Sequence, residues 1–260
     1  MSRGLWTRET VGVLLLAAYL PLAVFWLWFG NLGDFYRLAF TALVIAIWQL
    51  VFLLARAQPV SLSAVITALA IAMLAPEELG GFRLTLGISF GVVMGEMVFG
   101  GWGRNVVHPA TIALSFLGFG FPGFAWPEIV TPVAWAAIPA VVIGLFAGVM
   151  PAGVILAAIV GAGVATGLGV LPSSTLHAAG LVLVLLVADP VTSATTPLGR
   201  WLNGLLFIAL VVLFAQGWHG AAPVQFAVAA ALLTSLAAPL LDEAALALWY
   251  AQRRRRHGRY

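Results

Sequence analysis

The 260-residue sequence has no cysteine and few charged residues. Without thiolates, the chain cannot form disulfides or hold zinc or an iron–sulfur cluster through sulfur ligands of its own. Only 8% of its residues are charged and 63% are hydrophobic, whereas about 25% are charged in an ordinary soluble domain. So few polar residues cannot cover a soluble core. The composition excludes a soluble enzyme, a disordered protein and a nucleic-acid binder, and it indicates an integral membrane protein.

The apolar runs of the chain predict about ten helices in a single membrane domain, 1–260, with no soluble domain. Several of these helices are shorter than the roughly 20 residues that cross a bilayer. Short helices interrupted by glycine are typical of broken helices around a buried site. The predicted helices span residues 11–29, 37–55, 60–75, 83–100, 108–121, 131–149, 151–170, 177–188, 201–217 and 223–250.

Three landmarks recur along the chain at an offset of 114 or 115 residues. The corresponding positions are Ala75 and Asp189, Phe99 and Phe214, and Pro109 and Pro223. Five predicted helices separate the members of each pair, so we predict two inverted five-helix repeats, residues 10–125 and 126–250, followed by an arginine-rich tail, 251–260. Inverted repeats place their functional site near the midplane, where the repeats meet.

Lysine is also absent, and the twelve arginines predict the topology. In a ten-span arrangement most of them share one side of the membrane, while most acidic loop residues fall on the other, where Arg37 and Arg83 are exceptions. The positive-inside rule then places both termini of a multi-pass membrane protein in the cytoplasm. We interpret the terminal arginines as a topology anchor, with binding of lipid or a partner as the alternative. The arginines on this side are Arg3, Arg8, Arg56, Arg104, Arg200, Arg253–Arg256 and Arg259.

The densest polar stretch spans residues 95–110. It places Glu96 inside an apolar helix, then a glycine-rich turn, and then Arg104, Asn105 and His108 before the next helix. Asn105 or His108 is expected near the cap of that helix, whose N-terminus beside Arg104 suits a phosphate or another anion. A tight loop that only packs helices is the alternative. If Glu96 faces the bundle, it must be protonated or paired, with Arg104 for example, and it is a candidate for an ion or proton pathway.

A second polar stretch spans residues 188–200 and begins with Asp189 at the end of an apolar run. An ionisable group at the membrane boundary is a functional candidate. The hydroxyls of Thr192 and Thr195 can satisfy freed backbone groups in a turn, and Asp189 is placed to pair with Arg200. An ordinary capped loop is the alternative. The histidines are isolated in the sequence, and their spacing gives no sign of a metal site.

These stretches resemble the NqrB/RnfD family, which comprises membrane subunits of the Na+-translocating NADH:quinone reductase (Nqr) and of the Rnf electron transport complex. Phe-Gly-Gly-x-Gly-x-Asn-x-x-x-Pro-Ala at residues 99–110 resembles a hallmark of this family, with His108 where the family has a second asparagine. Residues 189–200 resemble the second hallmark, and residues 223–242 resemble the last helix. The resemblance implies a ten-helix inverted-repeat subunit, distantly similar to urea transporters, in a membrane complex that passes electrons through flavins.

The family typically carries FMN, linked by a phosphoester to a threonine on the extracytoplasmic side. The positional match is Thr131, without the usual Gly-Ala before it and the usual Asp upstream. A competing acceptor is Thr195, because Asp189-x-x-Thr192-Ser193-Ala194-Thr195 resembles the sequence that flavin transferases read. We prefer Thr131, since the topology places Thr195 on the cytoplasmic side. The chain is shorter than most members, so a reduced member that binds flavin non-covalently, or has lost it, is the alternative.

The resemblance favours an electron-transfer subunit whose flavin ring stacks in an apolar pocket between the repeats. Glu96 and Asp189 are the candidates for coupled movement of Na+ or H+. Because the chain has neither a nicotinamide fingerprint nor thiolates, partner subunits must supply iron–sulfur and further flavin carriers. The alternatives are a channel or transporter for a small neutral solute on the same scaffold, and a flavin-free scaffold subunit. The candidate cofactor-binding residues are Arg104, Asn105, His108, Thr131, Asp189, Thr192, Thr195 and Arg200.

Overall fold

The computed structural model describes residues 7–58 and 60–257, with side chains as far as Arg253, and within these ranges it contains helices and no strand. Two short π-helical segments, η1 (Val93–Met97) and η2 (Leu183–Val187), continue α4 and α8. The α-helices are α1 (Arg8–Phe29), α2 (Leu32–Arg56), α3 (Ser63–Leu74), α4 (Gly80–Val92), α5 (Pro109–Gly120), α6 (Thr131–Phe146), α7 (Ala152–Gly167), α8 (Ser173–Val182), α9 (Pro197–Gly217) and α10 (Pro223–His257).

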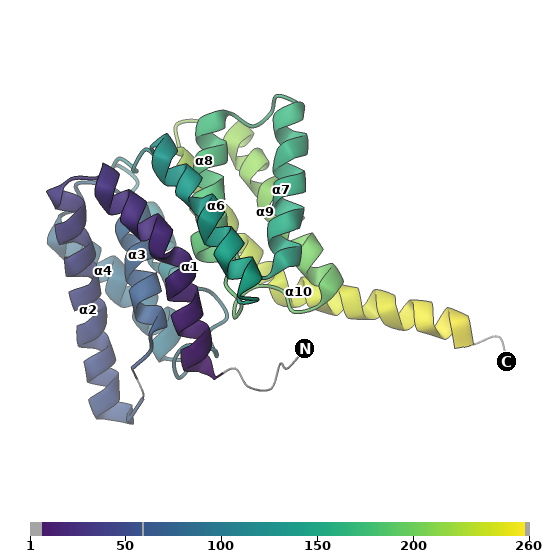
Figure 1. The fold of residues 1–260 in the computed structure, drawn as a ribbon, viewed down its shortest axis with the longest axis horizontal. Helices are drawn as coiled ribbons and strands as arrows, with labels where there is room; N and C mark the ends of the chain where they lie inside the picture. Colours follow the sequence, from purple (N-terminus) through teal and green to yellow (C-terminus); the bar gives the residue numbers. More distant parts are fainter. Residues whose placement is uncertain (1–6, 59, 258–260) are drawn as a thin grey trace.

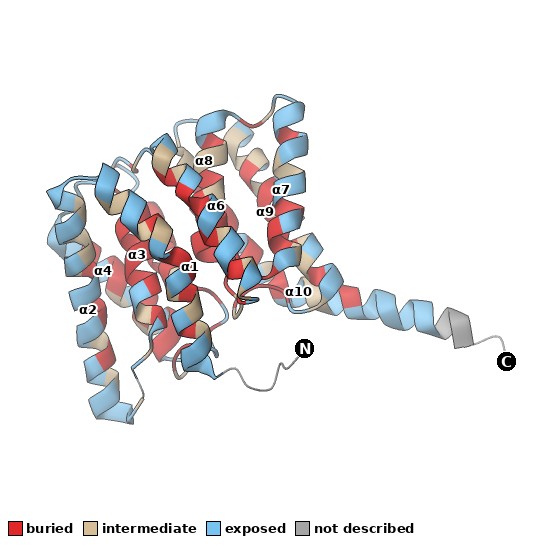
Figure 2. Cartoon of the chain, viewed as in Figure 1, coloured by how far each residue is buried: buried red, intermediate tan, exposed pale blue. Residues whose placement is uncertain are grey.

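The architecture confirms the predicted all-α, polytopic membrane protein. Four helices, α1, α2, α9 and α10, are long and apolar enough to cross a membrane. The shorter apolar helices are α3, α5, α6, α7 and α8 with its π-helical continuation. Buried residues lie where the helices face one another, and exposed apolar residues cover the outside of the bundle (Figure 2).

Most helices begin and end within a few residues of their predicted bounds, but α2 begins five residues earlier. Asn31 caps it, because its side chain accepts a hydrogen bond from the amide of Gly33 at 2.6 Å, while Asp34 accepts one from the amide of Asn31 at 2.8 Å. Thr196 caps α9 in the same way, accepting from the amide of Gly199 at 3.0 Å. Polar residues that the prediction assigned to loops therefore lie in the first turns of these helices.

The packing of the helices joins the two halves of the chain (Figure 1). The first helices of the two predicted repeats, α1 and α6, pack against each other, and so do the last, α5 and α10. Between them, α3 contacts η2, which lies in the part of the second half that corresponds to α3. Contacts between equivalent elements are what a two-fold relation between repeats requires, and the inverted relation itself stays a prediction.

Glycines allow close helix packing within each half. Gly87 and Gly91 of α4 and Gly95 of η1, spaced four residues apart, face α5, where a Cβ on Gly91 would lie 2.6 Å from the backbone nitrogen of Ala113. In the second half, Gly204 of α9 meets α7 in the same manner. Small residues let membrane helices approach closely enough for their backbones to touch. Close glycine contacts therefore join α4 to α5 in the first half and α7 to α9 in the second.

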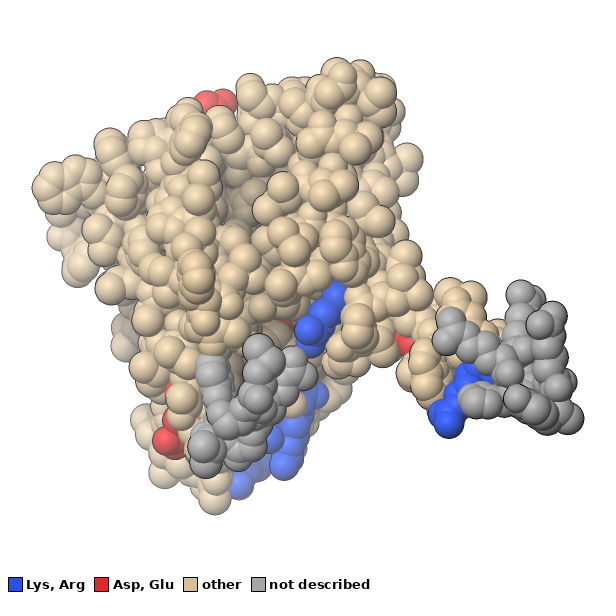
Figure 3. Space-filling model, turned by 45° about the vertical axis from the view of Figure 1, so that its right-hand side comes forward, with Lys and Arg blue, Asp and Glu red and all other residues tan. Residues whose placement is uncertain are grey.

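The bundle has two chemically different ends, which α1 joins. This helix has 22 residues, so its ends lie about 33 Å apart. At its start, Arg8 lies beside the loop between η1 and α5, and arginines gather at this end of the molecule (Figure 3). At its finish, a cavity brings α1 together with Asp34, Glu77 and Glu128. Most arginines and acidic loop residues thus lie at opposite ends, and the orientation of these ends in the membrane stays a prediction. Arg3 and the side chains of Arg254–Arg256 and Arg259 lie outside the described residues.

The two arginines at the acidic end have local partners. Arg37 of α2 donates to the backbone carbonyl oxygens of Ala75 and Pro76, the latter at 2.7 Å. These carbonyls follow the C-terminus of α3, where a positive charge is stabilised. The guanidinium of Arg83 lies 4.9 Å from the ring centroid of Phe124. Both charges therefore serve the packing of the short helices at this end.

Candidate functional site

Four ionisable side chains form a buried group where the two halves meet. We call Tyr19, Glu96, His108 and Asp189 the central polar cluster; each is at most 5% exposed. They come from α1, η1, the start of α5 and the loop after η2, and the first three lie close enough to Asp189 to interact with its charge. The hydroxyl of Tyr19 donates to the backbone carbonyl of Val184 in η2 at 2.8 Å. The structure therefore brings together residues that are up to 170 positions apart in the chain.

Glu96 lies on the π-helical segment η1 and is 2% exposed. Its carboxylate lies beside the backbone amide of Trp102 and the hydroxyl of Ser63. Among the described residues its Oε1 atom has no hydrogen-bond partner. A buried carboxylate with an unsatisfied oxygen is costly, and π-helical segments are frequent at functional sites. Glu96 therefore lowers the stability of the fold at this position, which points to a functional role for its carboxylate.

Asp189 follows the second π-helical segment and shapes the turn after it. Its Oδ2 atom accepts hydrogen bonds from the amide of Val191 at 3.2 Å, and from the amide and the hydroxyl of Thr192, both at 3.0 Å. The predicted pair of Asp189 with Arg200 is wrong, because Arg200 donates to the carbonyl of Ala194 at 3.2 Å. The local turn satisfies Asp189 more readily than a side chain from the next helix. All three of these hydrogen bonds go to Oδ2, and the other carboxylate oxygen of Asp189, Oδ1, takes no part in the turn.

The loop before α5 is closed by its own polar residues. His108 caps α5 as predicted, because its Nδ1 atom accepts from the amide of Ala110 at 3.3 Å and Pro109 begins the helix. Asn105 is buried and accepts from the amide of Gly103 at 3.1 Å. Arg104 is exposed and its side chain lies beside Gly100, whereas Glu96 is buried.

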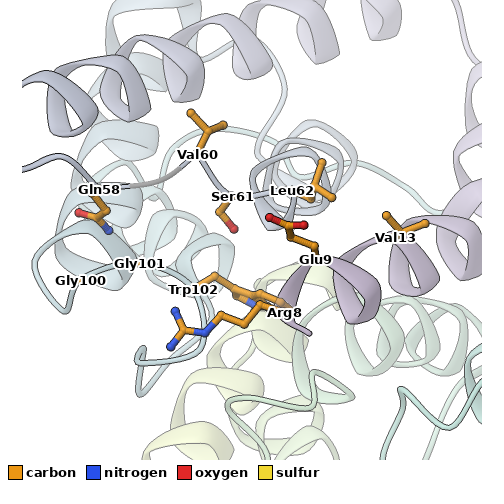
Figure 4. A pocket seen from close by; sticks show the side chains of 10 residues that line it. All are labelled: Arg8, Glu9, Val13, Gln58, Val60, Ser61, Leu62, Gly100, Gly101 and Trp102. Atoms are coloured by element: carbon orange, nitrogen blue, oxygen red, sulfur yellow. The ribbon is translucent and has the colours of Figure 1, made fainter. Parts of the chain in front are cut away.

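A cavity of about 460 Å³ opens beside this loop (Figure 4). Gly100 and Gly101 line it in the left-handed backbone conformation, with φ of +93° and +95°, which only glycine adopts without strain. Trp102 lines the same cavity, and its backbone amide lies beside Glu96. Trp102 thus lies between the cavity and the buried carboxylate of Glu96 in the sense that it contacts both. The remaining lining residues are Arg8, Glu9, Val13, Gln58, Val60, Ser61 and Leu62.

Thr131 lies at the opposite, acidic end of the bundle. It is the first residue of α6 and is exposed, and its N-cap, Val130, forms no side-chain cap. In the first turn Pro132 has no amide hydrogen, and the amides of Val133 and Ala134 donate to the carbonyl of Val130 at 3.0 and 3.1 Å. A phosphoester at Thr131 therefore fits this position through the exposed hydroxyl and the positive end of the helix dipole. The adjacent cavity, which includes Trp26 and Phe29, measures about 270 Å³, less than the roughly 300–1,000 Å³ of typical cofactor pockets. A flavin ring held at Thr131 would need more room than this cavity supplies.

Thr195, the competing acceptor, lies at the arginine-bearing end and is bound by Asp242 of α10. The carboxylate of Asp242 accepts from the hydroxyl and the amide of Thr195, both at 2.8 Å, and from those of Thr196 at 2.5 and 2.8 Å. We call this arrangement the Asp242 clamp. It fixes the loop that begins at Asp189 to the last helix. The clamp could not be predicted from the sequence, because no local pattern links residues that are 46 and 47 positions apart.

Replacing Asp242 with alanine is expected to lower the stability of the folded chain by about 2 kcal/mol, because four hydrogen bonds to a carboxylate are lost at a partly exposed site. For a chain of this size the melting temperature should fall by about 4–8 °C. Scanning fluorimetry of the protein in detergent measures the shift. Glu243→Ala removes the same charge from the exposed neighbour and serves as the control; equal shifts for the two variants would contradict the role of the clamp.

The described ranges contain no group of three histidine, aspartate or glutamate side chains close enough to hold a metal ion.

The family model of the NQR2, RnfD, RnfE family matches residues 6–137, just over half of the chain. The chain belongs to this family. The resemblance that the hallmark residues predicted is thereby confirmed. The segment that matches the NQR2, RnfD, RnfE family runs from α1 into α6 and contains Glu96, His108 and Thr131, whereas the stretch from Asp189 to Arg200 lies beyond it.

Similar proteins within the family include NqrB subunits of the Na(+)-translocating NADH-quinone reductase. The one from Yersinia pestis is 36% identical over 94 residues, which cover 35% of this chain and 23% of that protein. The one from Stutzerimonas stutzeri (strain A1501) is 37% identical over 84 residues, covering 32% and 21%. The chain therefore aligns with less than a quarter of the length of either relative.

Proposed function

We propose that this member of the family is a membrane subunit of an Nqr- or Rnf-type electron-transfer complex. In this role it carries a flavin and provides the central polar cluster as part of a path for Na+ or H+. The observation that carries the proposal is the placement of Glu96 and Asp189. Each carboxylate is buried at a π-helical segment, one in each half, where the halves pack together.

The cluster has the chemistry that a cation path requires. A carboxylate buried without a full set of hydrogen bonds is stabilised when a proton or a cation reaches it. The hydroxyl of Ser63 beside Glu96 and that of Thr192 beside Asp189 supply further oxygen atoms, and hard cations are bound by oxygen ligands. The cavity lined by Trp102 gives an approach from the arginine-bearing end. The chain would therefore hold a cation in transit between loops that both halves contribute.

Electron transfer needs groups that the chain itself does not supply. A flavin provides one- and two-electron chemistry, and Thr131 is the residue that we propose holds its phosphate, on the extracytoplasmic side. Iron–sulfur and further flavin carriers would come from partner subunits, since the sequence has no cysteine. We place the chain in the bacterial inner membrane with both termini in the cytoplasm, because the arginine-bearing end contains α1's start and α10's extension.

The sequence implied that the loop before α5 binds an anionic group of the cofactor. In this proposal its residues Arg104, Asn105 and His108 have other roles. Asn105 and His108 hold the loop and cap α5, and Asp189 and Thr192 form the turn after η2. These residues position the cluster rather than bind a flavin. Arg104 and Arg200, which reach the surface of the arginine-bearing end, remain available to an anionic group of a partner subunit.

A covalent flavin is expected at Thr131. When the chain is produced with its partner subunits and a flavin transferase, its band should fluoresce after denaturing electrophoresis, and Thr131→Ala should remove the signal completely. Thr195→Ala is the matched control, because the Asp242 clamp holds that hydroxyl, and it should keep the signal.

Other results of this measurement would change the proposal. Fluorescence that is lost only in Thr195→Ala would move the flavin to the arginine-bearing end. Fluorescence seen only before denaturation would mean a non-covalent flavin. No flavin in either state, with the partner subunits present, would contradict the electron-carrier function and favour a channel for a small neutral solute or a scaffold subunit.

A further inference from the structure

The last helix of the chain continues well beyond the bundle. The first part of α10 is largely buried, and the Asp242 clamp fixes it to the loop before α9. Ala245, 6% exposed, is the last buried residue of α10 among those with described side chains. From Leu246 to Arg253 every residue is exposed, and the helix runs sideways, crosswise to α6 and α7 (Figure 1). We call residues 246–257 the C-terminal extension.

The C-terminal extension combines apolar and cationic residues. Leu246, Leu248, Trp249 and Tyr250 are each about half exposed. The guanidinium of Arg253 lies 5.2 Å from the centroid of the Trp249 ring. The sequence carries five arginines in its last eight residues and no acidic residue after Glu243. Trp and Tyr favour the membrane–water interface, and clustered arginines favour anionic surfaces.

The position of the C-terminal extension decides which anionic surface it meets. It leaves the bundle at the end where Arg8, Arg104 and Arg200 lie, and it stands clear of the other helices (Figure 3). Because α1, α2, α9 and the first part of α10 cross the bilayer, a helix that leaves sideways at this end runs along the bilayer surface. The lipid headgroups are therefore the nearest charged surface, fixed beside the extension by the same chain.

We propose that the C-terminal extension is an interfacial helix that binds the anionic phospholipid headgroups of the leaflet on the arginine-bearing side. Leu246, Trp249 and Tyr250, which share one helical face, enter the headgroup region, and the arginines contact lipid phosphates. Cation–π contact keeps Arg253 next to the aromatic ring that enters the interface. Through the Asp242 clamp, the bound helix is joined to the loop that begins at Asp189. The proposal is independent of electron transfer.

The absence of cysteine allows a direct test with the full chain. Leu246→Cys creates a single site for an environment-sensitive fluorophore on the face that is proposed to enter the headgroup region. The labelled protein is placed in nanodiscs of phosphatidylcholine, alone or mixed with phosphatidylglycerol. In the anionic mixture the emission should shift to the blue and the label should be shielded from an aqueous quencher. A label at Gly123→Cys, in an exposed loop at the other end, is the control and should not respond to lipid charge.

The arginines are tested in the same labelled background with R253Q/R254Q/R255Q/R256Q. Each arginine near an anionic surface contributes about fivefold, so the response to phosphatidylglycerol should weaken by at least tenfold, and high salt should have the same effect on the parent protein. Equal shielding in both lipid compositions, or no effect of the arginine substitutions, would overturn the proposal. Shielding that appears only after partner subunits are added would assign the extension to a protein contact instead.

Discussion

Replacing Gly91 with valine is expected to prevent the chain from accumulating in a folded form. A Cβ atom at this position would meet the Cβ of Ala113 and would lie 2.6 and 2.7 Å from the backbone nitrogen and Cα of the same residue. Backbone atoms of a helix cannot move aside as a flexible side chain can. The α4–α5 pair would have to separate, and we expect a loss of at least about 3 kcal/mol, at the upper end of overpacking effects.

Gly163 offers a matched control for this substitution. It lies on α7, and no atom is within 4 Å of a Cβ built on it. Gly163→Val makes the same change of size and of helix propensity without a clash. Gel filtration of detergent extracts should show a monodisperse peak for Gly163→Val and aggregated or absent protein for Gly91→Val. A normal yield and melting temperature for Gly91→Val would contradict the close packing of α4 on α5.

Replacing Glu96 with glutamine is expected to reduce coupled ion movement by the whole complex at least tenfold while leaving the fold intact. Glutamine has nearly the same shape but cannot be ionised, so it offers no charge to a proton or a cation. Because Oε1 of Glu96 has no hydrogen-bond partner among the described residues, the neutral side chain should keep or raise the melting temperature. The measurement is the number of ions taken up per electron transferred, in vesicles that contain the complex with Glu96 or with glutamine at this position.

Two further variants separate a role in ion movement from a structural role. Glu9→Gln removes an exposed carboxylate that lines the Trp102 cavity at the start of α1, and it should leave coupling nearly unchanged. Glu96→Asp keeps an ionisable group in the same place and should restore part of the activity. Unchanged ion uptake per electron in Glu96→Gln would remove Glu96 from the path.

The helices were predictable because their signals are local. Apolar runs and capping residues predicted most bounds to within a few residues, and His108 was correctly placed at the cap of α5. At α2 the prediction was wrong because residues 32–36 were left outside the helix. The side chain of Asp34 closes the capping box of α2, and Arg37, predicted as the first residue of the helix, lies in its second turn and binds the end of α3. A charge inside a membrane helix reveals its partner only when the tertiary packing is known.

The candidate site was predictable only in part. Glu96 and Asp189 stood out because ionisable groups are rare in this sequence, but nothing local indicated that π-helical segments precede or contain them. Tyr19, which completes the central polar cluster, lies in an apolar run and gave no signal. Asp242 likewise acts on Thr195 and Thr196 from the last helix. These relations depend on which helices pack together, and the order of residues along the chain does not encode that in any short pattern.

The packing of α1 on α6 has a consequence for how the protein is made. Helices α2 to α5 are synthesised between α1 and α6, the helix against which α1 packs, and η2, whose Val184 carbonyl accepts from Tyr19, is synthesised later still. Until then, the small-residue contacts of α4 with α5 can form, and α1 can pack against α3. The first half therefore enters the membrane as an unfinished assembly, whose open face is closed by the second half of the same chain.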